Sequence, residues 1–117
     1  MKLSEAKRRG LVRSPSIGRW MTDGAIPGID ETTQGAARDL SQFDLMTVRV
    51  FEIIAQATNS DLVAAYKCAD VARQRFLTGN LMPLNLQIMP HVQITFDLAG
   101  IVLDIAAAER AIALGVK

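Results

Sequence analysis

The side chains best suited to chemistry in this chain are hydroxyl and guanidinium groups near its start. Ser14 suits the N-cap of a helix, Pro15 suits its first position, and Gly24 suits the left-handed residue that ends it. The polar side chains on or beside the open face of a helix over 14–23 are Arg13, Ser14, Ser16, Arg19 and Thr22. Such groups at the positively polarised end of a helix indicate binding to a phosphate-rich surface.

The sequence gives little indication of a disulfide, a metal site, a catalytic site or a phosphate-binding loop. Cys68 is the only cysteine, which excludes a disulfide framework and a multi-cysteine zinc site. His91 is the only histidine and precedes an alternating run, where we expect it to face solvent without the partner that acid–base catalysis needs. Gly24, Gly28 and Gly35 are too scattered for a phosphate-cradling loop. We therefore expect no catalytic residue, metal site or cofactor, and we do not expect an enzyme.

Two short helices must position the polar groups. Ile17, Trp20 and Met21 recur at helical spacing, so they form an apolar stripe on which the helix over 14–23 can pack, with Trp20 largely buried. Ser4 is the expected N-cap of an earlier helix that ends at Gly10. Two helices joined so closely predict a helix-turn-helix.

Positive charge is concentrated in the same region. Residues 1–38 hold seven basic and four acidic side chains, a net of +3, whereas residues 39–117 hold six and eight, a net of −2. This asymmetry is typical of a nucleic-acid-binding head on a neutral body. The side chains expected to hold phosphates are Lys2, Lys7, Arg9 and Arg38.

The segment over 25–40 has turn chemistry and no helical period. Ile26-Pro27-Gly28 predicts a turn, and polar residues follow as far as Gln34. We interpret the segment as a hairpin, or wing, with Arg38 on its returning arm. A disordered linker is the alternative.

Two longer helices are expected next. Ser41 and Asp44 have the spacing of a capping box, and Asn59-Ser60-Asp61 separates this helix from one over 62–77 that ends at Gly79. The buried face of the first is expected to hold Phe43, Met46, Val50, Ile53, Ile54 and Ala57. Its solvated face is expected to hold Arg49, Glu52 and Gln56.

The last third of the chain combines alternating runs with a helix. Residues 84–88 and 92–96 alternate between apolar and polar types, which predicts half-buried strands. Because Met89-Pro90 leaves little chain for a tight hairpin, we expect one bent strand or pairing with other segments. A final helix begins near Asp97 and is apolar beyond one stripe, so residues after about 84 are expected to form a homodimer interface.

The expected fold is mainly α with a small β component. A winged helix-turn-helix domain over residues 1–78 would be followed by a C-terminal strand–helix dimerisation element over residues 79–117. The start of the chain lacks the apolar run of a signal peptide, and acidic residues interrupt the later apolar stretches, so no membrane span is expected. These features indicate a cytoplasmic, nucleoid-associated protein.

Residues 1 to about 75 resemble the MerR-like winged helix-turn-helix family. The shared pattern consists of Lys2-Leu3-Ser4-Glu5-Ala6, Arg19-Trp20, Asp23-Gly24-Ala25-Ile26-Pro27, a polar wing ending in Gly35 and Arg38, and Ser41-Gln42-Phe43-Asp44-Leu45. The resemblance implies that Arg13, Ser16 and Arg19 lie near the major groove and that Arg38 contacts a phosphate beside the wing. The family's long dimerisation helix and cysteine-rich loop are missing, so the chain is more similar to compact, phage-type members.

Three functions fit these observations. The first is a sequence-specific DNA-binding transcriptional regulator, with Lys2, Ser4, Lys7, Arg9, Arg13, Ser14, Ser16, Arg19 and Arg38 on double-stranded DNA. The second is a phage-type DNA-packaging or recombination accessory protein that uses the same head. The third is a protein–protein adaptor that has lost DNA binding, which the small net charge favours.

Overall fold

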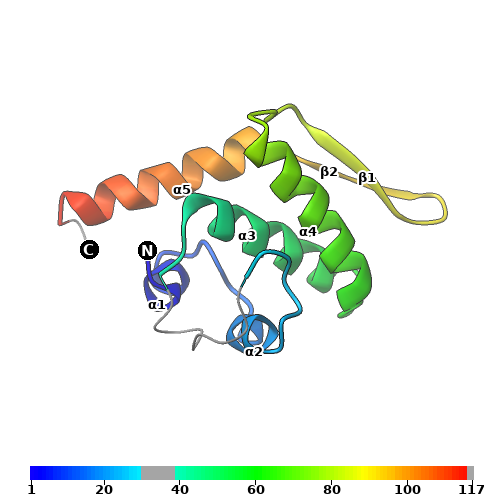
Figure 1. Cartoon of the computed structure of the whole chain (residues 1–117), viewed down its shortest axis with the longest axis horizontal. Coiled ribbons are helices and arrows are strands. Elements are labelled where there is room, and N and C mark those ends of the chain that lie inside the picture. Colours follow the sequence, from blue (N-terminus) through cyan, green and yellow to red (C-terminus); the bar gives the residue numbers. More distant parts are fainter. Residues whose placement is uncertain (30–38, 116–117) are drawn as a thin grey trace.

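The computed structural model describes residues 1–29 and 39–115 and is mainly helical with a small antiparallel sheet (Figure 1). The helices are α1 (Leu3–Arg8), α2 (Ile17–Thr22), α3 (Gln42–Ala57), α4 (Leu62–Leu77) and α5 (Leu98–Ala113), and the strands are β1 (Leu84–Met89) and β2 (Val92–Phe96). No helix in the described ranges is long and apolar enough to cross a membrane.

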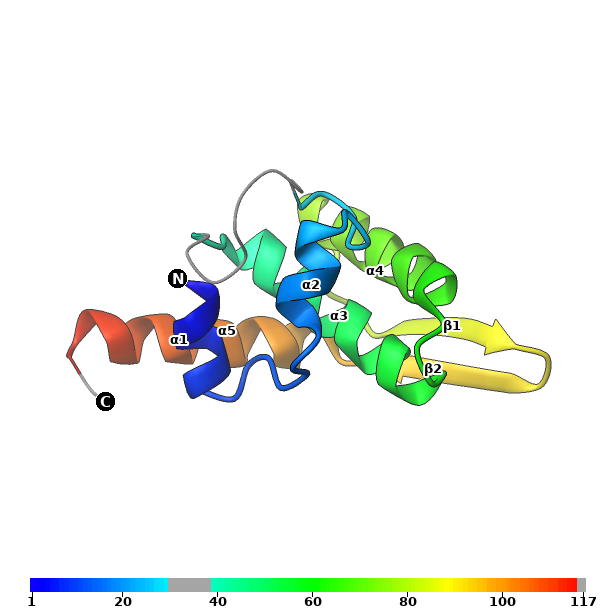
Figure 2. The ribbon, with the colours of Figure 1, turned by 90° about the horizontal axis from the view of Figure 1, so that it is seen from below.

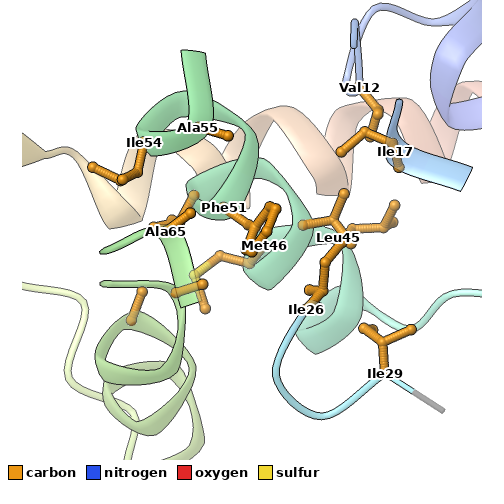
Figure 3. Packing of buried hydrophobic residues seen from close by; sticks show 14 of the residues in the cluster. Val12, Ile17, Ile26, Ile29, Leu45, Met46, Phe51, Ile54, Ala55 and Ala65 are labelled. Carbon is orange, nitrogen blue, oxygen red and sulfur yellow. The ribbon is translucent and has the colours of Figure 1, made fainter. Parts of the chain in front are cut away.

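Helix α3 lies at the centre of the molecule. It packs most extensively against α4 and also against α5. The short helices α1 and α2 lie side by side on one outer face, in front of α3 and α5 in Figure 2. Figure 3 shows Val12 and Ile17 gathered beside Leu45 of α3, with Ala65 of α4 on another side of that helix. One apolar core therefore supports both the outer face and the central helix.

The three long helices begin where the sequence predicts them. The Ser41 hydroxyl accepts from the Asp44 amide at 3.1 Å while the Asp44 carboxylate accepts from the Ser41 amide at 3.2 Å, which confirms the capping box. Asp61 and Asp97 cap α4 and α5 by accepting from the amides three residues on. These caps depend only on neighbours in the chain, so the local pattern was sufficient to predict them.

Both short helices begin elsewhere than predicted. The N-cap of α1 is Lys2 rather than Ser4, because the backbone of Lys2 pairs with Asp39 and the Lys2 carbonyl accepts from Ala6. The N-cap of α2 is Ser16 rather than Ser14. Gly10 and Gly24 follow the ends of these helices with positive φ angles, as expected.

The two alternating runs form a hairpin, which corrects the expectation that they would not pair with each other. Leu84 lies opposite Phe96 and Leu86 opposite Ile94 in antiparallel register. Pro90 and His91 form the turn between the strands, with His91 at φ 65°. Proline followed by a residue of positive φ suits a two-residue turn, and the register shifts between Gln87 and Met89.

The C-terminal segment shares the core of the helices before it. Leu84, Phe96, Leu98 and Ile105 are buried in the same apolar cluster as residues of α1 to α4. Farther along the hairpin and α5, apolar side chains become exposed, and these include Met89, Val92, Leu103, Ile112 and Leu114.

Most of the predicted wing lies outside the described residues. The turn at its start is present: Gly28 has a φ of 73°, and the Ile29 amide donates to the Ile26 carbonyl at 3.4 Å. At the other end, Asp39 pairs with Lys2, and the amino group of Met1 donates to the Leu40 carbonyl at 2.9 Å. The predicted phosphate contact Arg38 lies outside the described residues.

Candidate nucleic-acid interface

The turn between α1 and α2 is held by a buried carboxylate. Glu52 of α3 is 0% exposed, and its Oε2 accepts from the backbone amides of Arg13 at 2.8 Å and Ser14 at 2.6 Å. Its Oε1 accepts from Nη1 of Arg49 at 2.6 Å. Both oxygens of the carboxylate are thus satisfied by charge-assisted hydrogen bonds, which is the condition for keeping such a group inside a protein.

This position of Glu52 corrects the expectation that it would lie on the solvated face of its helix. Leu45, Val48 and Ala55 lie seven and four residues before it and three residues after it, and all three are buried. Residues at these spacings share one face of a helix. That pattern is a signal in the sequence that could have placed Glu52 inside.

Ser14 has a structural role in the turn. Ser14 is 7% exposed, and its hydroxyl accepts a hydrogen bond from the Ser16 amide at 3.2 Å. Because Glu52 binds its amide, Ser14 lies inside the molecule and precedes the helix instead of capping it. Ser14, which the sequence predicts to contact DNA, is therefore buried and does not lie on the exposed surface of α1 and α2.

Helix α2 turns its apolar side inward and its polar side outward. Ile17 and Met21 are fully buried. Trp20 is partly buried and packs against the apolar core, with its ring 5.4 Å from that of Phe51 in an edge-on arrangement. Arg19 projects outward, and its only ion pair among the described residues is with Asp23 at 3.6 Å.

Helix α1 adds further cations to the same outer face. Of the residues predicted to contact DNA, Lys2 at the N-cap of α1, Ser4 and Lys7 in α1, and Arg13 in the turn are exposed, while Ser16 is half-buried. Figure 2 shows α1 and α2 on the same side of the molecule, in front of α5 and α3. These exposed side chains and Arg19 therefore belong to two neighbouring helices and the segments beside them.

Glu5 restrains two of the arginines. Arg8 donates to both of its carboxylate oxygens, at 3.2 and 2.5 Å, and Nε of Arg9 donates at 2.7 Å. The hydrogen bonds from Arg8 and then Arg9 lower the pKa of Glu5 below its ordinary value. Arg9 is consequently held close to the body of the protein, whereas Arg8, which was not among the predicted contacts, is more exposed.

The other side chains considered for chemistry in the sequence are Cys68 and His91. No group of three or more histidine, cysteine or acidic side chains there could hold a metal ion. Cys68 is buried, and burial raises the pKa of its thiol. His91 is exposed at the tip of the hairpin.

Comparisons with family models, curated proteins and solved structures found no match to this chain.

Proposed function

We propose that this protein binds double-stranded DNA through the outer face of α1 and α2. Helix α2 would enter the major groove with Arg19 directed at base edges, while Lys2, Lys7 and Arg13 would contact phosphates. The observation that carries the proposal is the attachment of the α1–α2 turn to Glu52, which fixes two short helices relative to each other while their cationic sides face outward. A rigid support of this kind is what a recognition helix needs, because base readout depends on placement.

Arg19 and Lys7 can bind DNA without losing a strong interaction within the protein. The pair between Arg19 and Asp23 has side chains that are 84% and 59% exposed, and exposed pairs contribute little free energy. Arg19 can therefore exchange Asp23 for a base or a phosphate. Lys7 is exposed and forms no ion pair within the described residues, so its charge is directed to solvent. We further propose a regulatory role in transcription for the bound protein.

The test is duplex binding measured by fluorescence anisotropy over a range of salt concentrations. We expect affinity to fall steeply as salt rises, with a slope of about −0.9 for each phosphate neutralised. Lys7→Ala should weaken binding to all duplexes equally and reduce the slope by about one unit. Lys67→Ala is the matched control, since this exposed lysine belongs to α4 and not to α1 or α2.

Arg19→Ala tests the proposed base contact. Against a duplex obtained by in vitro selection, we expect a loss of about 1–3 kcal/mol and relaxed preference at one base position. Equal losses on selected and random duplexes would assign Arg19 to the phosphate backbone. Duplex binding that is absent, or unchanged in both Lys7→Ala and Arg19→Ala, would contradict the proposal.

A protein–protein adaptor is the second candidate. The pairing of Arg8 and Arg9 with Glu5, and of Arg19 with Asp23, favours it because these pairs reduce the positive field of the α1–α2 face. The same salt series separates the two functions, since an adaptor would show no salt-dependent affinity for duplex DNA. A DNA-packaging or recombination accessory would bind DNA as the regulator does, and reporter transcription would distinguish those two roles.

A further inference from the structure

A solvent-open hollow of about 570 Å³ lies between the α1–α2 turn and α5. One wall carries three arginines, Arg8, Arg9 and Arg13, and the opposite wall carries Asp104, Ala107 and Ala108 of α5. Figure 2 shows α1 crossing in front of α5, with the turn continuing beside it. The hollow thus joins the N-terminal helices to the last helix of the chain.

A smaller cavity adjoins the hollow. This cavity of about 80 Å³ shares Gly10, Leu11, Arg13 and Asp104 with the hollow, and the rest of its lining is Leu45, Arg49, Ile101 and Ile105. The combined space therefore has arginines at its mouth, and its inner part offers aliphatic side chains beside Arg49, which is paired with Glu52. Ligand sites have this character, with apolar walls and a few polar groups that set orientation.

The arginines at the mouth are oriented before any ligand arrives. Glu5 accepts from Nε and Nη2 of Arg8, which leaves Nη1 of that guanidinium to bind another acceptor. Nε of Arg13 donates to the Gly10 carbonyl at 3.4 Å, and its terminal nitrogens remain for a ligand. Arginine groups held in this way lose less conformational entropy on binding a carboxylate or phosphate.

We propose that this hollow binds a small organic anion. Its carboxylate or phosphate group contacts Arg8 and Arg13, and its apolar part occupies the inner cavity beside Leu11 and Ile105. Asp104 faces this anion across the hollow and lowers the affinity for a ligand without a hydrogen-bond donor. The proposal goes beyond DNA binding and does not depend on it, because the site is formed by the protein alone.

The experiment uses 8-anilinonaphthalene-1-sulfonate, which combines an anionic group with apolar rings and fluoresces when bound. In the absence of DNA, Arg13→Gln should weaken its binding roughly tenfold, since it removes a charge-assisted hydrogen bond. Ala107→Trp should block the hollow, and Asp104→Asn should strengthen binding by removing the opposing charge. Arg110→Gln is the matched control, because it removes an exposed arginine of α5 that does not line the hollow.

Competition identifies the anionic group. Hexyl phosphate and hexanoate should displace the probe, and the stronger competitor shows whether phosphate or carboxylate is preferred, whereas neutral hexanol should not displace it. Circular dichroism of each variant confirms that the helices are intact. The proposal is overturned if the probe does not bind, if all variants bind it equally, or if hexanol competes as well as the anions. None of these outcomes bears on duplex affinity, so failure here is distinct from failure of DNA binding.

Discussion

Glu52 joins α3 to the α1–α2 turn through a carboxylate with no exposed surface. Transfer of a carboxylate from water is costly, and hydrogen bonds from the Arg49 guanidinium and two backbone amides offset that cost. The interaction therefore stabilises the fold chiefly because its loss would leave a buried charge or two backbone amides without a hydrogen-bond partner. At this scale, one side chain determines how the outer face is attached to the core.

Replacement of Glu52 by alanine is expected to lower the free energy of unfolding by about 3–5 kcal/mol, as for other broken buried ion pairs. Glu52→Gln should cost less, because the amide oxygen can still accept one backbone hydrogen bond. Urea denaturation followed by the fluorescence of Trp20, the only tryptophan, measures both. Asp104→Asn is the control, and this exposed substitution should stay within about 0.5 kcal/mol of wild type. Equal stability of Glu52→Ala and wild type would show that the turn does not depend on this carboxylate.

Two helices contain a glycine, Gly18 in α2 and Gly100 in α5, and the space around the two glycines differs. A Cβ added to Gly18 in α2 would meet only Cδ2 of Leu3, at 4.0 Å. A Cβ added to Gly100 in α5 would collide with the carboxylate of Asp97, which caps that helix. The same substitution should therefore strengthen one helix and disturb the start of the other.

Gly18→Ala is expected to stabilise the protein by about 0.5–1 kcal/mol, because alanine loses less backbone entropy in a helix. Gly100→Ala should show no gain, or a loss of up to about 1 kcal/mol if the cap is broken. Thermal unfolding of the two variants side by side is the measurement. A gain at Gly100 equal to that at Gly18 would mean that the Asp97 cap contributes nothing.

Exposed apolar side chains on α5 and the hairpin are a feature of the whole molecule. Of the residues first expected at an interface, Ile105 and Phe96 are buried in the core, whereas Leu114 is exposed. Leu103, also on α5, is 66% exposed. Apolar side chains left in solvent on one segment favour association, and two copies would place two α2 helices on one duplex.

We expect a homodimer through residues after about 84, measured by light scattering at tens of micromolar, roughly where a specific interface holds. Leu103→Glu should shift the population to monomer because it buries a charge in the interface. Val63→Glu is the matched control, since Val63 is equally exposed at 66% but lies on α4. A monomeric wild type, or identical effects of the two variants, would refute the expectation.

The sequence by itself determined the helices that depend on near neighbours. The capping residues Ser41, Asp61 and Asp97 and the glycines that follow α1 and α2 act within a few positions of the chain, so their patterns could be interpreted directly. The outward position of Arg19 also followed from local periodicity, because its neighbours Ile17 and Met21 needed to be buried.

Only the tertiary structure decided the features that join distant residues. Glu52 binds amides 39 and 38 positions earlier, and this contact moved Ser14 into the interior. Strand pairing across Pro90-His91 and the hollow between the α1–α2 turn and α5 likewise depend on packing. The buried neighbours of Glu52 on its helix could have placed it inside, but nothing near it in the sequence indicates which distant amides would bind it. Those partners are what allow a charge to leave water.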